Sequence, residues 1–86
     1  MNIPESIELG VREVLRAHGR LSADAMTLPV ADNLYESGMT SHSSVNVMLG
    51  LEDRWGVEFP DHLLTRDTFM SVQRIAETLM SLGVSA

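Results

Sequence analysis

The sequence predicts an all-α fold, a small antiparallel bundle of three main helices plus a short one, with a long first loop. Three segments repeat their apolar residues at helical spacing, and neither internal repeats nor linkers interrupt the chain. A chain of 86 residues buries on folding only about 60 to 65% of the surface that it exposes when unfolded. We therefore expect a single domain over residues 1–86, of modest stability.

The first helix is predicted between Pro4 and His18. Its apolar residues fall at i, i+4, i+7 and i+8 and so form one stripe: Ile7, Val11, Val14 and Leu15. Asn2 or Ile3 is the expected cap, and Pro4 suits the first turn because its φ is already fixed. Gly19 offers a C-terminal stop.

Residues 20–39 lose this periodicity and predict a long loop. The segment collects residues that favour turns, namely Pro29, Asp32, Asn33 and Gly38. We expect four side chains to anchor it in the core: Leu21, Leu28, Leu34 and Tyr35. A loop of nearly twenty residues indicates either function or a missed element, and a short helical turn near Asp24 to Met26 is the alternative.

The second helix is predicted from Ser41 to Trp55, with Gly56 ending it. Its apolar residues are numerous, so we expect a helix that is largely packed. One line along it carries Ser44, Met48, Leu51 and Trp55, and beside that line stand Val45, Val47 and Leu49.

A short third helix is predicted in a turn that Asp61 caps and that contains Leu63 and Leu64. Ser71 is expected to cap the final helix, because serine side chains accept hydrogen bonds from first-turn N–H groups. The buried face of that helix should consist of Val72, Ile75, Ala76 and Leu79. Residues 83–86 are expected to form a frayed tail.

The chain is acidic, with twelve acids, six bases and a net charge of −6, and every base is arginine. A negative surface repels nucleic acid and anionic membranes and steers the chain toward proteins with a basic patch. The alternative is that the charge only keeps the domain soluble. No basic segment precedes an apolar run, and no stretch approaches the roughly 18 apolar residues of a membrane span, so we expect a cytoplasmic protein.

Several chemistries are missing from the sequence. Without cysteine the chain has no disulfide, thiolate metal site or cysteine nucleophile. The three histidines, His18, His42 and His62, are widely separated in the sequence, and none has a second possible metal ligand at helical spacing. We therefore expect no metal site, and we expect these histidines to be exposed. The sequence shows neither the residues of a nucleophilic triad nor a glycine-rich phosphate-binding loop, and we therefore expect that the protein is not an enzyme.

The segment NLYESGMTSHSSVNVMLGLEDRWGVEFPD resembles the central signature of acyl carrier proteins. Gly38, Ser41, Val45, Leu51 and Glu52 follow one another in the family's order and spacing, and the resemblance extends over nearly the whole chain. In that family the serine that opens helix two bears 4′-phosphopantetheine, whose thiol holds an acyl group as a thioester. The resemblance therefore implies an acyl-carrier-like bundle with the cofactor, which derives from coenzyme A, on Ser41.

Local chemistry also favours a modified serine at this position, since the N-terminus of a helix stabilises a phosphodiester by about 0.3 to 1 kcal/mol. It leaves two alternatives open. Ser41, Ser43 or Ser44 could simply be a helix cap, and Ser43 is the alternative attachment point. Where the family has Asp-Ser-Leu, this sequence has Thr40, Ser41 and His42.

The runs GMTSHSSVNVMLGLED and VEFPDHLLTRDTF look like a bacterial subgroup, the aminoacyl carrier proteins. That resemblance implies an amino acid as cargo and two partners, a phosphopantetheinyl transferase and a ligase similar to the core of a seryl-tRNA synthetase. The alternatives are a fatty-acyl or polyketide carrier served by acyl-processing enzymes, and a non-catalytic helical interaction module without a prosthetic group. We expect a monomer whose partners read exposed residues near the start of helix two and in the following loop: Met39, Thr40, His42, Ser43, Asn46, Phe59, Leu63 and Leu64.

Overall fold

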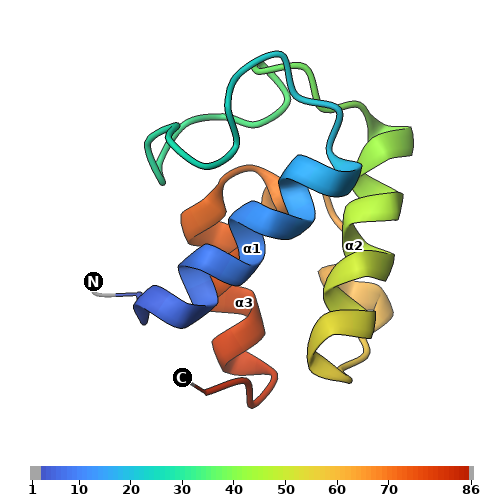
Figure 1. Cartoon of the computed structure of the whole chain (residues 1–86). Coiled ribbons are helices and arrows are strands. Elements are labelled where there is room, and N and C mark those ends of the chain that lie inside the picture. The colour runs from blue at the N-terminus through green and yellow to red at the C-terminus, as the bar shows by residue number, and fades with distance from the viewer. Residues whose placement is uncertain (1–2, 86) are drawn as a thin grey trace.

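The computed structural model describes residues 3–85, and this part of the chain is helical without any strand (Figure 1). Its three main helices are α1 (Glu5–His18), α2 (Ser41–Trp55) and α3 (Val72–Ser81). Two 3₁₀ turns lie between α2 and α3, namely η1 (Asp61–Leu63) and η2 (Asp67–Phe69). The prediction of a three-helix bundle with a long first loop is confirmed, and η2 is a second short element that the sequence did not reveal.

The apolar stripes predicted for α1 and α3 meet in one core. All eight of their side chains are buried: Ile7, Val11, Val14, Leu15, Val72, Ile75, Ala76 and Leu79. Leu28 and Leu34 anchor the long loop as predicted, whereas Leu21 and Tyr35 are only partly buried against this core. Ala25 and Met39 are further anchors, so the loop contributes its own layer to the core.

Helix α2 is less packed than predicted. Val47 and Leu51 are fully buried, but Val45 is 50% exposed and Leu49 is 52% exposed. Both exposed residues stand two positions from Val47, and a rotation of about 100° per residue places them on the opposite side of the helix. The apolar side chains of α2 thus point to opposite sides of the helix, and the core covers only one of these sides.

Two glycines bring α1 and α2 close together. A Cβ atom at Gly10 would lie 2.6 Å from the Trp55 ring, and one at Gly50 would lie 2.8 Å from the His18 ring. Such distances are far below an ordinary contact, so these positions need glycine for the present packing. Trp55 consequently packs against α1 at Gly10. The C-terminal half of α2 is therefore in close contact with α1.

The helix ends partly differ from the expectations. Pro4 itself is the N-cap of α1 and provides no side-chain bond, so Ile3 is not the cap, while Asn2 lies outside the described residues. Gly19 ends α1 with its N–H on the Leu15 carbonyl at 2.7 Å. Its φ of −77° is right-handed, and the left-handed residue is Arg20, with a φ of 56°.

The ends of the later elements give one confirmation and two corrections. Ser71 caps α3 as predicted, accepting the Arg74 N–H at 3.1 Å. The cap of η1 is Pro60 instead of Asp61. The frayed tail predicted for residues 83–86 is wrong for residues 83 and 84, because the Gly83 N–H reaches Met80 O and the Val84 N–H reaches Leu79 O, the two bonds of a Schellman motif. Ala86 lies outside the described residues.

The long loop is fastened to α1 by Arg12, a buried side chain with 8% exposure. Its Nη1 donates to Ala25 O at 3.0 Å and to Leu28 O at 2.7 Å, and its Nε donates to Glu8 Oε2 at 3.0 Å. The carbonyls belong to a turn in which Thr27 and Leu28 donate to Asp24 O. The alternative of a short helical turn near Asp24 to Met26 is therefore confirmed as a single turn, and the structure has no helix there.

Candidate functional site

The start of α2 is positioned by the end of the long loop. Ser22 closes the loop by donating its N–H to Ser37 O at 2.7 Å, and Gly38 follows with a φ of 114°. A Cβ atom at Gly38 would lie 3.1 Å from the Ser22 nitrogen, so both the backbone angle and the space favour glycine. Met39 then buries its side chain, which leaves Thr40 and Ser41 at the molecular surface.

Thr40 is the cap of α2 and forms a capping box with Ser43. The Thr40 Oγ1 accepts the Ser43 N–H at 3.0 Å, and the Ser43 Oγ accepts the Thr40 N–H at 2.8 Å. The hypothesis that one of the serines is the N-cap is therefore wrong. Threonine at this position, where the acyl carrier pattern has an acid, supplies the side-chain oxygen that the helix start requires.

Thr40→Ala should destabilise the protein by about 1 kcal/mol, because it leaves the Ser43 N–H without its acceptor. Ser41→Ala, one residue further on, is the matched control and should cost less than about 0.5 kcal/mol. Urea unfolding of both variants measures the difference. Equal stability of the two would contradict the assignment of Thr40 as the cap.

The three serines of the first turn differ in accessibility. Ser43 is fully buried, and the Ser44 Oγ is committed to Ser41 O at 2.7 Å. Ser41 is exposed, and its Oγ has no hydrogen-bond partner within residues 3–85. Ser41 is thus the serine of this turn whose hydroxyl is available for chemistry, and burial disfavours Ser43 as the alternative attachment point.

Two backbone donors accompany this hydroxyl. Thr40 takes the N–H groups of Ser43, through Oγ1, and of Ser44, through its carbonyl at 2.9 Å. In the described part of the chain, no acceptor takes the N–H groups of Ser41 and His42. Free N–H groups at the positive end of a helix attract an anion, so the start of α2 suits a phosphate ester on Ser41.

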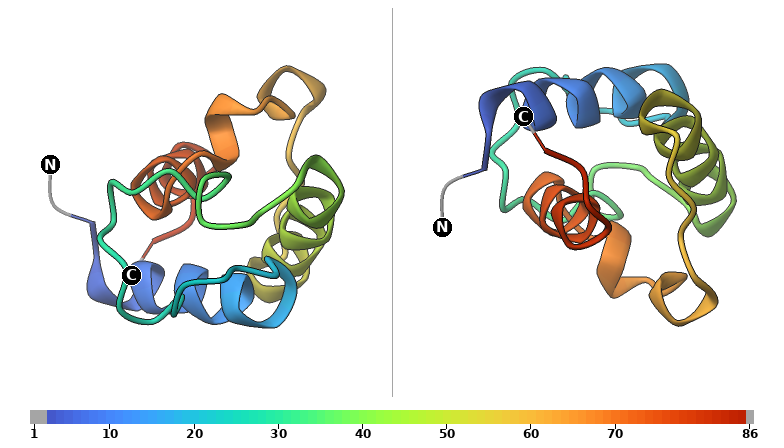
Figure 2. Two further views of the ribbon diagram at one scale, coloured as in Figure 1. Left: turned by 90° about the horizontal axis from the view of Figure 1, so that it is seen from above. Right: turned by 90° about the horizontal axis from the view of Figure 1, so that it is seen from below.

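A cleft of about 370 Å³ extends from Ser41 between α2 and the segment around η2. One wall is α2, with Ser41, Ser44, Val45 and Met48, and the facing residues are Tyr35, Leu64, Thr65, Arg66 and Phe69. The lining is mostly apolar. In Figure 2 the segment carrying η1 and η2 runs along the side of the molecule away from α1. Residues of this segment and of α2 form most of the lining of the cleft.

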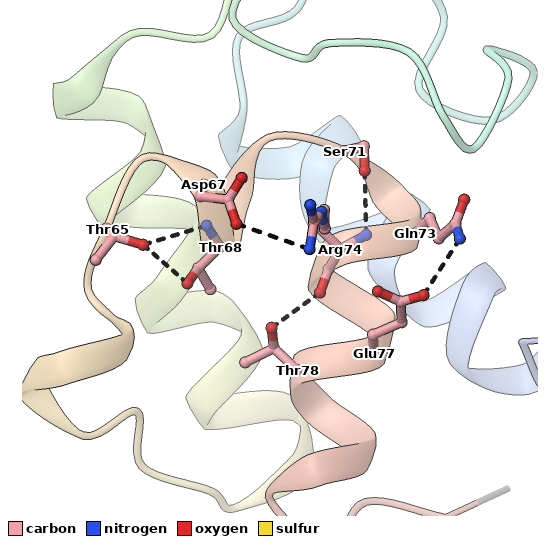
Figure 3. Close-up of polar contacts among 8 residues, drawn as sticks. All are labelled: Thr65, Asp67, Thr68, Ser71, Gln73, Arg74, Glu77 and Thr78. Atoms are coloured by element: carbon pink, nitrogen blue, oxygen red, sulfur yellow. Dashed lines mark hydrogen bonds and ion pairs between the residues drawn. The ribbon is translucent and has the colours of Figure 1, made fainter.

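Polar contacts hold the facing segment in place (Figure 3). The hydroxyls of Thr65 and Thr68 are 3.1 Å apart, and Arg74 of α3 pairs with Asp67 at 3.7 Å. On the α2 side, Glu52 Oε2 accepts the Phe59 N–H at 2.8 Å and so fixes the turn after the helix. Glu52 is therefore committed to the fold rather than offered to a partner.

The residues predicted to contact partners fall into two groups. Thr40, His42 and Leu64 are exposed, and Asn46 and Leu63 are partly so. The expectation of exposure is wrong for Met39, Ser43 and Phe59, which the structure buries. The reason is local: Met39 and Phe59 are the apolar residues that fasten the loops on either side of α2, and Ser43 completes the capping box.

Three features of this surface were missed from the sequence. Val45 and Leu49 are exposed on α2, and Arg66 lines the cleft with its Cζ 3.9 Å from the centroid of the Tyr35 ring. Periodicity pointed to Val45 and Leu49 as apolar residues of the helix but not to which face the core would cover. No sequence signal indicated the pairing of Arg66 with Tyr35, because it depends on how two loops meet.

His18, His42 and His62 are exposed as predicted. Within residues 3–85 no three histidine, cysteine or acidic side chains gather as a metal site would require. None of the helices described is long and apolar enough to cross a membrane.

The chain matches no family model. It is 39% identical over 69 residues to the aminoacyl carrier protein of Agrobacterium fabrum, a match over 80% of this chain and 83% of the relative. A structural neighbour with a TM-score of 0.84 is 36% identical, and the match covers 87% of this chain and 97% of the neighbour. That neighbour comes from a crystal structure of an engineered Bradyrhizobium japonicum glycine:[carrier protein] ligase complexed with carrier protein from Agrobacterium tumefaciens and ATP.

A solution structure of an Agrobacterium tumefaciens protein is a further neighbour. Its TM-score is 0.68 at 36% identity, and the match covers 86% of this chain and 89% of the neighbour. The three matches cover 80 to 87% of this chain. The similarity therefore extends well beyond the α2 segment.

Proposed function

The chain belongs to the family of aminoacyl carrier proteins, and on this premise we propose that it carries an activated amino acid on a 4′-phosphopantetheine arm joined to Ser41. Partner enzymes would receive the cargo from this arm. The protein itself supplies a rigid support, an attachment point and a docking surface.

One observation carries the proposal for the site. Ser41 is exposed, its hydroxyl is not used by the described residues, and it opens α2, whereas Ser43 and Ser44 are buried or nearly so and hydrogen-bonded. A modifying enzyme has to reach the oxygen that it esterifies, and Ser41 offers that oxygen. The capping box leaves Ser41 free, because Thr40 and Ser43 fulfil the structural needs of the helix start.

The residues around Ser41 fit a phosphodiester. In the attachment reaction, Ser41 Oγ would bond to the pantetheine-bearing phosphorus of coenzyme A, while the bond to adenosine 3′,5′-bisphosphate breaks. A base of the transferase would take the hydroxyl proton. The free N–H groups of Ser41 and His42 would then be available to the negative charge that stays on the serine. When bound, the arm supplies a terminal thiol that can hold an amino acid as a thioester.

The comparisons support an amino acid as the cargo rather than a fatty acid. The structural neighbour was crystallised with a glycine:[carrier protein] ligase and ATP, so we propose that the partners are an amino acid:carrier-protein ligase and a phosphopantetheinyl transferase. The likeness of that ligase to a seryl-tRNA synthetase core stays a prediction. α2 has no acid in its first turn, unlike carriers that dock through an acidic helix two.

Loading assays test the proposed cargo. The protein is first converted with a transferase and coenzyme A, then incubated with ATP and an amino acid:carrier-protein ligase, or with a fatty acyl ligase and its substrates. We expect an amino acid adduct that neutral hydroxylamine removes, as it removes thioesters. A carrier that accepts only fatty acyl groups would contradict the proposed cargo, and a protein that accepts no arm would contradict the carrier function altogether.

A further inference from the structure

Arg66 is one of three arginines without a carboxylate partner among the described residues, and it is the one of these three that lines the cleft. Arg12, Arg54 and Arg74 are paired with the carboxylates of Glu8, Glu13 and Asp67. Within residues 3–85, no carboxylate lies within 4.0 Å of the Arg66 guanidinium and no acceptor takes its N–H groups. Its one partner is the face of the Tyr35 ring, 3.9 Å from Cζ.

This arrangement leaves the guanidinium ready for an anion. Stacking on a ring uses the flat face of the group, and its N–H donors lie at the edge, where they suit a phosphate. Arg66 is also the one charged side chain among the residues that line the cleft, and Ser41 lines the same cleft. Arg66 is therefore a cation without a carboxylate partner that shares a cleft with the proposed attachment serine, where a negative group could meet it.

We propose that Arg66, held on the Tyr35 ring, binds the phosphodiester of the arm on Ser41 and so holds the first part of that arm against the cleft. The inference rests on the proposed function. Arg66 acts here as a positioning residue, because it contacts the phosphate and not the thiol or the cargo. A phosphodiester on Ser41 could then accept from two donor groups, the free N–H groups at the start of α2 and the guanidinium of Arg66.

The other cations do not compete for this role. Arg16 and Arg20 also lack a carboxylate partner among the described residues, but neither lines the cleft. His42 is next to Ser41 in the sequence and is exposed, yet it is absent from the lining of the cleft. Arg16 is therefore a suitable control, since its replacement removes the same charge from α1.

Nuclear magnetic resonance of the modified protein tests the inference without any loading reaction. The Nε–H resonances of the arginines are compared before and after attachment of the arm, together with the ³¹P resonance of the phosphodiester. We expect attachment to shift the Arg66 Nε–H resonance and to leave that of Arg16 in place. Raising the salt from about 50 mM to about 500 mM should shift the ³¹P resonance of the wild type, because salt screens exposed ion pairs.

Variants make the assignment specific. In Arg66→Met the ³¹P resonance should already stand at its high-salt position, whereas Arg16→Met should behave as the wild type does. Tyr35→Leu should lower the shift of the Arg66 resonance by about two- to fivefold, since it removes the ring beneath the guanidinium, and Tyr35→Phe should restore the shift. Arg66 is exposed, so Arg66→Met leaves the core untouched, and Tyr35→Phe keeps the ring that packs against the core.

The outcomes separate this inference from the function on which it rests. A modified protein whose Arg66 resonance does not respond to the arm, or whose ³¹P resonance is the same in Arg66→Met and the wild type at low salt, overturns the inference alone. Mass spectrometry of the same sample reports the modification itself. A sample that takes up no arm on Ser41 overturns the proposed function and this inference together.

Discussion

Ser41→Ala should abolish attachment of the arm and all loading of amino acid, while the fold stays intact. The substitution removes the exposed hydroxyl of the first turn, and the remaining serines are buried or hydrogen-bonded. Thr40 and Ser43 keep the capping box, so the melting temperature should change by less than about 3 °C. Intact mass after treatment with a transferase and coenzyme A measures attachment, and circular dichroism measures the fold.

Ser44→Ala is the matched control for this experiment. It deletes a hydroxyl on the same turn of the same helix, one that bonds to Ser41 O and is nearly buried. Attachment should therefore persist in Ser44→Ala at a level close to that of the wild type. Attachment in Ser41→Ala, or its loss in both variants, would speak against Ser41 as the site.

Arg12→Met should destabilise the protein by about 2 to 4 kcal/mol, because it removes the hydrogen bonds of a buried side chain. This is the largest effect on stability that we expect from any of the substitutions that we propose. The change removes hydrogen bonds to Ala25 O, Leu28 O and Glu8, and methionine cannot satisfy the two buried carbonyls. For a domain of this size such a loss lowers the melting temperature by roughly 10 to 25 °C. Thermal and urea unfolding measure it.

Arg16→Met provides the comparison for Arg12→Met. Arg16 is an exposed residue of the last turn of α1, so its loss should cost less than about 1 kcal/mol. Arg12→Lys should recover only part of the stability, because one ammonium cannot reproduce the planar fork of a guanidinium. Equal stability of Arg12→Met and Arg16→Met would show that the loop does not depend on this contact.

Local signals explain what the sequence alone could predict. Helical periodicity identified the buried stripes of α1 and α3, serine preference identified the cap at Ser71, and the position of Gly38 before Ser41 indicated the turn into α2. Each of these depends on neighbouring residues, which the sequence displays directly. The family resemblance added the proposed attachment residue, and the structure then distinguished Ser41 from Ser43 and Ser44 by burial and hydrogen bonding.

The features that escaped prediction depend on residues far apart in the chain. In the sequence, Arg12 looks like an ordinary surface residue of α1. In the structure, the turn at residues 24–28 places two backbone carbonyls within hydrogen-bond distance of it. Arg66 likewise gains its role only where its loop meets Tyr35. The capping residue of α2 escaped prediction for a different reason. Threonine and serine can both cap a helix, and the sequence does not show that Thr40 takes this position.

Peptide mapping of the wild-type protein tests the central claim most directly. After treatment with a phosphopantetheinyl transferase and coenzyme A, trypsin releases residues 21–54 as one peptide, because no lysine or arginine lies between Arg20 and Arg54. Fragmentation of this peptide should place one phosphopantetheine group on Ser41. A group on Ser43 or Ser44, or a peptide that stays unmodified under conditions in which a known carrier protein is fully converted, would contradict the account.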